Sequence, residues 1–369
     1  MGLSRDSLPA DVMDQFRRGG VLPAHPLALD EQRRLDSVRQ RALTRYYLDA
    51  GAHGLAVGVH TTQFGIRKVG LFEPVLKLAA ETARDWRSGT TVLIAGVTGD
   101  TTQAVSEAEI ALRHGYHAAL VNLAGLRNRT EEEVLAHCRK VAKVMPVLGF
   151  ALLPTVGGRH FSYRFWRGFS DIENVVGIKV ATFDRYRTLE VVRAVADAQA
   201  AERITLYTGN DDHILLDLLT PFPVRQPNGE ETVIRFRGGL LGHWSVWTRS
   251  AVRLFERTRT IPDGAPIPAE LLALDARVTD CNAAIYDAAH DLRGCIPGCL
   301  EVLRRQGLLR GTWCLDPNER LSDGQVEEID RVYRLYPELN DDAFVRSNLT
   351  RWLSDDGVKI PLFDEEEAQ

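Results

Sequence analysis

The chain of 369 residues is 44% hydrophobic and 26% charged, which is typical of a globular protein with a substantial core. Its formal net charge of -5 gives no reason to expect a nucleic-acid partner. No apolar run approaches the ~18 residues of a membrane-spanning helix, and the polar start lacks a signal-peptide core, so no membrane association is expected. The five cysteines are too sparse for a disulfide framework and indicate a reducing cytoplasm.

Short β-type runs recur along the first part of the chain at intervals of roughly 30 residues, the length of one strand-helix unit. They lie at 19–25, 54–60, 91–97, 117–123, 146–153, 174–181, 203–209 and 238–244. Segments 131–145 and 188–202 between them carry apolar residues spaced three and four apart, as in helices that cover a sheet. This alternation predicts a parallel sheet that is buried on both faces.

Eight such units predict a closed (β/α)8 barrel, an α/β fold, over residues 1–250. An open doubly wound sheet would need a Gly-rich phosphate-binding turn after its first strand, and GGVLPAHPLALDE contains none. Beyond residue 250 the strand signals stop, and helical patterns occupy 267–294, 297–307 and 324–336. Residues 251–369 are therefore predicted to be a C-terminal helical extension, which a Pro- and Gly-rich linker at 257–268 connects to the barrel.

In a barrel of this kind the chemistry gathers at the carboxyl ends of the strands. The residues that the predicted strands place there are His25, His60 to Thr62, Gly96, Asn122, Ala151 to Pro154, Lys179, Gly209 to Asp212 and His243. These residues are the candidate active site.

Lys179 is the most informative of them, because lysine is scarce in this chain and this one follows the apolar run 175–178. An amine pressed against apolar walls loses hydration in its charged form, so its pKa falls. The free amine attacks a ketone to form a Schiff base, and the iminium then acts as an electron sink. The ordinary alternative is a lysine that extends its charged end to solvent or pairs with a carboxylate.

The pair Thr61 and Thr62 offers hydroxyls and backbone amides that can hold a substrate carboxylate, although threonines at this position also cap helices. His60 and His243 are candidate acid-base residues, since the pKa of histidine lies near working pH. Each of them is also compatible with a purely structural, hydrogen-bonded role.

Metal binding has weaker support. Asp211, Asp212, His213 and His243 carry suitable oxygen and nitrogen atoms, but their spacing matches no metal motif. Cys295 and Cys299 lack a second ligand pair, which favours buried thiols over a zinc site.

Three segments resemble motifs of the dihydrodipicolinate synthase and N-acetylneuraminate lyase superfamily, the class I Schiff-base aldolases and dehydratases. GLAVGVHTTQ (54–63) is similar to that family's strand-two motif, NVVGIKVAT (174–182) to its strand-six lysine motif, and LYTGNDD (206–212) to its strand-seven segment. The order and spacing of the three segments match from about residue 20 to the C-terminal helices.

The resemblance implies a (β/α)8 barrel enzyme that acts on pyruvate or a related 2-keto acid, with Lys179 as the imine-forming residue. It implies that Thr61 and Thr62 hold the substrate carboxylate and that the pocket is lined by Ala151, Gly209, Asn210 and Asp211. It also implies a homo-oligomer, a tetramer or a dimer. No metal or organic cofactor is expected, because the lysine itself supplies the electron sink.

The chain departs from the family pattern at the proton relay. The strand-five tyrosine, expected three residues before Pro154, is Ala151, and the arginine expected two residues after that proline is Val156. Gln63 and Phe64 replace the usual Gly-Glu after the threonines. We therefore expect proton transfer to fall to His60, His243, Tyr207 or a water.

Two alternatives remain open from the sequence. The first is a non-catalytic keto-acid binder that kept the barrel, which the missing tyrosine favours and the retained Lys179 opposes. The second is a metal-dependent barrel enzyme that uses Asp212 and His243.

Overall fold

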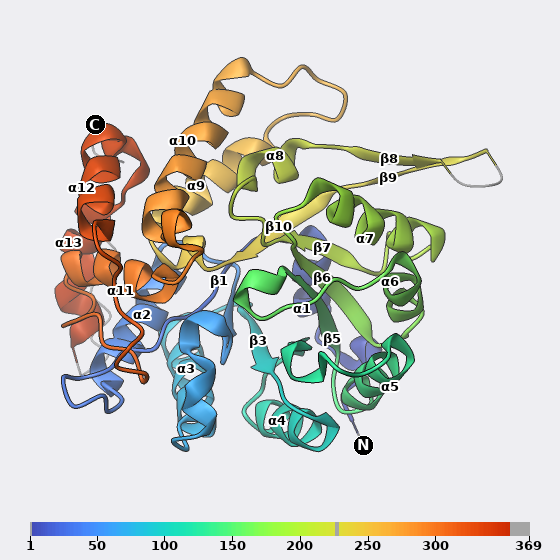
Figure 1. The fold of residues 1–369 in the computed structure, drawn as a ribbon, viewed down its shortest axis with the longest axis horizontal. Coiled ribbons are helices and arrows are strands. Elements are labelled where there is room, and N and C mark those ends of the chain that lie inside the picture. Colours follow the sequence, from blue (N-terminus) through green and yellow to red (C-terminus); the bar gives the residue numbers. More distant parts are fainter. Residues whose placement is uncertain (1, 226–228, 355–369) are drawn as a thin grey trace. The chain divides into compact units, whose positions relative to one another are not determined.

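The computed structural model describes residues 2–225 and 229–354. Eight parallel strands alternate with helices along the chain and form one sheet in the order β1-β10-β7-β6-β5-β4-β3-β2 (Figure 1). This arrangement is that of a (β/α)8 barrel with additional C-terminal helices, so the predicted fold class is confirmed. The strands are β1 (Val21–Pro23), β2 (Gly54–Val57), β3 (Val92–Val97), β4 (Ala118–Val121), β5 (Val147–Leu152), β6 (Val175–Ala181), β7 (Thr205–Thr208) and β10 (Phe236–Leu241).

Each of the eight predicted β-type runs overlaps one of these strands. By its contacts the chain divides into two units, one formed by Met1–Gly20 with Val92–Leu240 and the other by Val21–Thr91 with Leu241–Gln369. The predicted domain division at residue 250 stays a prediction. Among the described helices, none combines the length and the apolarity needed to cross a bilayer.

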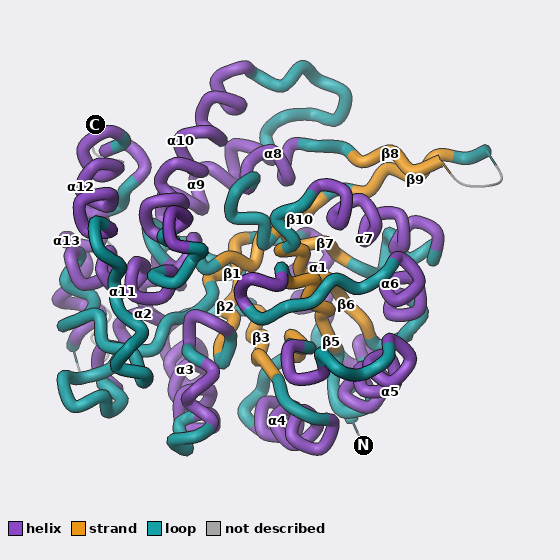
Figure 2. Tube along the Cα trace, viewed as in Figure 1, coloured by secondary structure: helices purple, strands orange, loops and turns teal. Residues whose placement is uncertain are grey.

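In the first unit, helices α4 (Thr101–Arg113), α5 (Glu131–Ala142), α6 (Tyr163–Ser170) and α7 (Arg185–Asp197) follow strands β3 to β6, and Figure 2 shows them around the outside of these strands. Each of the four helices begins at a residue whose side-chain oxygen accepts a backbone N–H of the first turn. These caps are Asp100, Thr130, Ser162 and Asp184. Such caps satisfy helix N–H groups that have no partner within the helix, so they fix where each strand-to-helix loop ends.

Strand β6 is buried along its whole length. It pairs in parallel with β5 and β7, and this register places Lys179 between Phe150 of β5 and Tyr207 of β7. A strand that is buried on both faces of the sheet is a continuous hydrophobic run in the sequence, and for this reason β6 could be predicted. The lysine is the one charged residue in that run.

An antiparallel hairpin, β8 (Phe222–Arg225) with β9 (Glu231–Ile234), follows helix α8 (Ile214–Leu219) and was not predicted. In Figure 1 it extends as an arm beyond α7. The hairpin was not predicted because both strands are short and because β8 contains Pro223, and proline is disfavoured in all but edge strands. Helix α1 (Ala10–Arg18), ahead of the first strand, was also missed.

The second unit carries β1, β2 and the C-terminal helices. Its helices are α2 (Ser37–Asp49), α3 (Phe72–Trp86), α9 (Thr248–Arg259), α10 (Ala269–Ile285), α11 (Cys295–Arg305), α12 (Gln325–Leu335) and α13 (Asp342–Leu353). The predicted linker at 257–268 lies largely between α9 and α10. Helix α13 was not predicted; it packs on α2, where the fully buried Trp352 donates its indole N–H to Asp49 at 2.6 Å.

A buried carboxylate ties the C-terminal helices to α2. Asp341 accepts hydrogen bonds from the Tyr46 hydroxyl at 2.7 Å, from the backbone N–H of Arg249 at 2.9 Å and from the Gln306 amide at 2.7 Å. Burial raises the pKa of Asp341 from 3.8 to about 6 despite these donors. The native state therefore binds a proton at this site more tightly than the unfolded chain does.

We expect Asp341 to make the protein less stable as pH rises. The pKa of Asp341 is higher in the folded state than in the unfolded chain, so its protonation stabilises the folded state. This contribution to the free energy of unfolding, on the order of 3 kcal/mol, is complete below about pH 4 and is lost as pH rises through about 6. In Asp341→Asn this component should disappear, so the difference in melting temperature between the two proteins should change between acid and neutral pH. The exposed Asp85→Asn is the control. A difference that is independent of pH would contradict the assignment.

Candidate active site

The predicted site residues fall in both contact units, and the structure fixes the geometry within each unit. Lys179, Ala151, Gly209, Asn210 and Asp211 belong to the first unit, and His60, Thr61, Thr62 and His243 belong to the second.

Lys179 lies within β6, two residues before its end, and only 9% of its surface is exposed. Its Nζ is 4.4 Å from the centre of the Phe150 ring. Burial lowers the pKa of the Lys179 ammonium from 10.5 to about 8, and the negative charge of Asp211 opposes this effect. At pH 7 about a tenth of this side chain is therefore free amine, the form that nucleophilic attack requires.

Gly209 gives the lysine its room at the end of β7. A Cβ atom at this position would lie 2.6 Å from Lys179 Cε and 2.9 Å from Ala181 Cβ, closer than real contacts allow. The structure thus brings together Lys179, Gly209 and the charge of Asp211, three of the residues that the sequence singled out.

Asn210 has a structural task. Its side-chain oxygen accepts the backbone N–H groups of Thr182 at 2.9 Å and Phe183 at 3.0 Å, and its Nδ2 donates to Asp217 at 2.9 Å. These bonds join the loop after β6 to the loop after β7 and hold Phe183 at a φ of 50°, which non-glycine residues rarely adopt. A substrate-binding role for Asn210 would need these bonds to change.

On β5, the residue beside the amine is Phe150. Ala151, the position predicted from the spacing to Pro154, pairs with Val180 and is buried. Sequence reasoning missed Phe150 because strand register, rather than distance from the proline, decides which side chain reaches the lysine. Neither a phenyl ring nor a methyl group can transfer a proton.

Tyr207 does not fill this gap. It pairs with Lys179 in register, but its buried hydroxyl donates to the backbone carbonyl of Phe16 in α1 at 3.0 Å. Its ring packs near Gly177, two residues before the lysine on β6. The Tyr207 hydroxyl therefore serves the packing of α1, and the expectation that it could act as the proton relay has no support.

The two threonines join the segment after β2 to the segment after β1. The Thr61 hydroxyl donates to the carbonyl of Ala24 at 2.7 Å, and the Thr62 hydroxyl donates to that of His25 at 2.6 Å. Thr62 also accepts the backbone N–H of Gly58 at 3.0 Å, so both its donor and its acceptor capacity are in use. A substrate carboxylate needs hydrogen-bond donors. The Thr61 hydroxyl can become one by rotating away from Ala24, whereas the Thr62 hydroxyl would have to give up its hydrogen bonds to both His25 and Gly58.

The two histidines differ. His60 begins the short 3-10 helix His60–Thr62, is half-buried, and its ring centre lies 5.9 Å from that of Phe64. His243 follows β10 and is buried, which lowers its pKa to about 4 and keeps the imidazole neutral near pH 7. Among the described residues, none forms a hydrogen bond with His243 Nδ1.

Within the described residues, no group of three or more His, Cys, Asp and Glu side chains is arranged so that it could hold a metal ion. The five cysteines are free and buried. The segment with Cys295 and Cys299 is explained by packing, since a Cβ at the intervening Gly298 would lie 1.8 Å from the carbonyl oxygen of Ile285.

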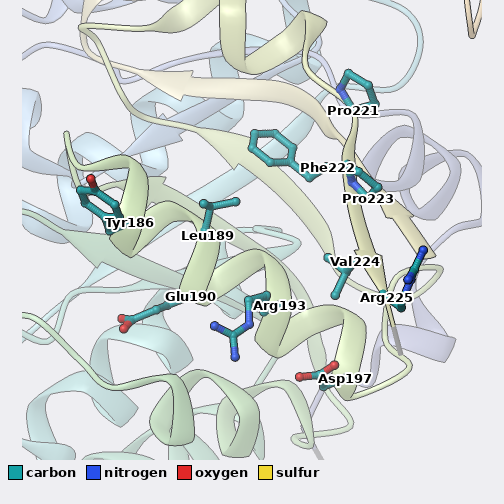
Figure 3. A pocket seen from close by; sticks show the side chains of 10 residues that line it. All are labelled: Tyr186, Leu189, Glu190, Arg193, Asp197, Pro221, Phe222, Pro223, Val224 and Arg225. Atoms are coloured by element: carbon teal, nitrogen blue, oxygen red, sulfur yellow. The ribbon is translucent and has the colours of Figure 1, made fainter. Parts of the chain in front are cut away.

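A surface groove of about 870 Å³ lies elsewhere in the first unit, between α7 and β8 (Figure 3). Tyr186, Leu189 and Arg193 of α7 face Phe222 and the residues after it in β8. None of the predicted site residues lines this groove. Its size therefore says nothing about the chemistry of Lys179.

The first unit thus buries a lysine in strand β6 under the influence of the negative charge of Asp211. The model of the dihydrodipicolinate synthetase family matches residues 17–220, more than half of the chain. The chain belongs to this family.

Curated relatives also match more than half of the chain. N-acetylneuraminate lyase of Citrobacter koseri is 28% identical over 204 residues, 54% of this chain and 65% of that protein. N-acetylneuraminate lyase of Salmonella typhimurium is 27% identical over the same shares of the two chains. The match thus spans slightly less than two thirds of the length of these relatives.

Solved structures cover more of the chain. CdNal from Clostridium difficile, in complex with mannosamine, has a TM-score of 0.69 at 17% identity and covers 86% of this chain and 99% of that chain. Dihydrodipicolinate synthase from Acinetobacter baumannii, complexed with pyruvate, has a TM-score of 0.69 at 16% identity and covers 86% of this chain and 98% of that chain. At these identities the similarity shows the fold alone.

We expect Lys179 to react with amine reagents with a midpoint near pH 8. Replacing the carboxylate in Asp211→Asn should lower this midpoint, because Asp211 raises the pKa of the ammonium. Reductive methylation over a pH series, read by peptide mass spectrometry, measures it, with the exposed Lys77 and Lys140 as internal references. A midpoint for Lys179 equal to that of the exposed lysines, or one that rises in Asp211→Asn, would refute this account.

Proposed function

We propose that this protein is a Schiff-base-forming lyase, an aldolase or dehydratase, that acts on pyruvate or a related 2-keto acid. The observation that carries the proposal is the buried Lys179, whose pKa is lowered towards neutrality in a strand that is otherwise apolar. The amine lone pair attacks the keto carbon, and a proton moves from nitrogen to oxygen to give a carbinolamine. Loss of water after uptake of one proton leaves the iminium.

Two neighbours of the amine suit this sequence of steps. The Phe150 ring and the buried strand disfavour the charged ammonium and so favour the attacking form. The carboxylate of Asp211 then stabilises the positive charge that returns when the iminium forms. No metal or organic cofactor enters the proposal, because the iminium withdraws electrons by itself.

The remaining roles follow the family resemblance. Thr61 and Thr62 would hold the keto-acid carboxylate, and of the two we favour the Thr61 hydroxyl, because that of Thr62 is fully engaged. Gly209 shapes the floor of the pocket by leaving room for the lysine, and Ala151 and Asn210 remain proposed lining residues. His60 and His243 remain candidate acid-base groups.

The relatives support the same reaction class. The curated ones are named as N-acetylneuraminate lyases, and one solved structure of this fold was determined with pyruvate. Like the commonest assembly in its family, this chain is proposed to form a homo-oligomer, a tetramer or a dimer. A cytoplasmic location is proposed because all five cysteines are free.

A second function has one observation in its favour. Because Phe150 and Ala151 carry no hydroxyl beside Lys179, the strand-five proton relay is absent, as a non-catalytic keto-acid binder would tolerate. Such a binder would have no need of a buried amine, and we therefore rank it second.

Borohydride reduction in the presence of pyruvate should trap a covalent adduct on Lys179, because reduction fixes the imine as a stable secondary amine. Peptide mass spectrometry should find the adduct on the peptide that contains Lys179 and on no other lysine peptide. Lys179→Met, confirmed as folded by circular dichroism, should give none. A panel of longer 2-keto acids, tested in the same way, would rank the substrates.

The same experiment separates the two functions. If wild-type protein binds pyruvate by calorimetry but yields no adduct, and Lys179→Met binds equally well, the protein is a keto-acid binder rather than a lyase.

A further inference from the structure

The surface that strands β5 and β6 present beside the Lys179 amine is apolar. Both strands are described in full, and Lys179 is the only polar side chain on either of them. Phe150 of β5 pairs with Lys179, and two residues closer to the carboxyl end Leu152 pairs with Ala181. Because side chains alternate along a strand, Phe150 and Leu152 lie on the same face of the sheet. The Phe150 ring is next to the amine, so Leu152 continues that surface towards the strand end.

Ala181 continues the same surface on β6. Because a Cβ atom at Gly209 would lie close to both Lys179 Cε and Ala181 Cβ, these two side chains point towards the end of β7 together. Phe150, Leu152 and Ala181, here called the apolar wall, therefore extend from the amine to the carboxyl ends of the strands, where (β/α)8 barrels bind their substrates. Phe150 and Ala181 are buried, whereas Leu152 is half-buried and so can contact a ligand.

Backbone hydrogen bonds fix the end of this wall. The N–H of Leu153 donates to the carbonyl of Ala181 at 2.9 Å, and the carbonyl of Leu153 accepts the N–H of Gly158 at 3.0 Å. A Cβ atom at Gly158 would lie 2.0 Å from the carbonyl oxygen of Leu152, so the loop after β5 folds back tightly on the strand end. These backbone groups are engaged within the protein, and the position of Leu152 is held by the loop.

Two polar side chains that follow these strands serve the loops. Nη1 of Arg159 donates to the carbonyls of Arg127 at 3.1 Å and Arg129 at 2.7 Å, and so holds the loop after β4. Thr182, the residue after β6, donates its hydroxyl to the carbonyl of Asp184 at 2.9 Å. A polar group of a substrate at the apolar wall would therefore compete with bonds that the loops already use.

We propose that the substrate is a 2-keto acid whose chain beyond C3 ends in an alkyl or aromatic group, and that Leu152 is a specificity-determining residue for it. This inference rests on the proposed function. A hydroxyl or carboxylate against the apolar wall gives up hydrogen bonds to water without replacement, whereas an apolar group gains free energy by leaving water. The negative charge of Asp211 further disfavours a second carboxylate near the amine.

The test compares two keto acids of similar shape, 5-methyl-2-ketohexanoate and 2-ketoglutarate, which carry two methyl groups and two carboxylate oxygens, respectively, at C5. Borohydride trapping on Lys179 over a concentration series gives the concentration for half-maximal adduct. In the wild type we expect this concentration to be at least about 10-fold lower for the methylated acid, a discrimination usual for apolar pockets.

Leu152→Asn, which places an amide of similar size in the apolar wall, should move the ratio of the two concentrations towards one. Pyruvate ends at C3, so its half-maximal concentration should be the same in this variant as in the wild type, which a general structural defect would not allow. The matched control is Leu189→Asn, which alters an exposed leucine of α7 and should keep the wild-type ratio.

The outcomes are distinct. If the wild type forms adducts but does not favour the methylated acid, or if folded Leu152→Asn keeps the wild-type ratio, the inference is overturned and the proposed function stands. Absence of an adduct with pyruvate and with both longer acids overturns the proposed function and this inference with it. If Leu152→Asn does not fold, Ala181→Ser decides, because it adds a hydroxyl to the same wall. A ratio closer to one in that variant supports the inference, and an unchanged ratio overturns it.

Discussion

The desolvation of one ammonium group is the constraint on which the candidate site depends. Lys179 sits in a strand whose seven residues are all buried, and burial lowers its pKa. The negative charge of Asp211 offsets part of the desolvation cost of the ammonium. Gly209 has no side chain, and this leaves the space that the Lys179 side chain occupies beside the end of β7. Two residues in the loop after β7, Gly209 and Asp211, thus act on the single amine of β6.

The sequence predicted the strands and the lysine because both leave strong local signals. Buried parallel strands are continuous apolar runs, and a charge within one of them stands out. The hairpin β8–β9 left no such signal, since its strands are short and contain Pro223. Helix α13 was missed although its buried face, with Trp352, is packed on α2, because that face gains its meaning only from the helix it covers.

The site was predicted less completely than the fold, for a geometrical reason. Counting from Pro154 selects Ala151, whereas strand pairing places Phe150 beside the amine. Likewise, the spacing of Thr61 and Thr62 cannot reveal that both hydroxyls donate to backbone carbonyls just after β1. A motif identifies which residues occur at a strand end, but their free hydrogen-bonding capacity depends on contacts that are distant in sequence.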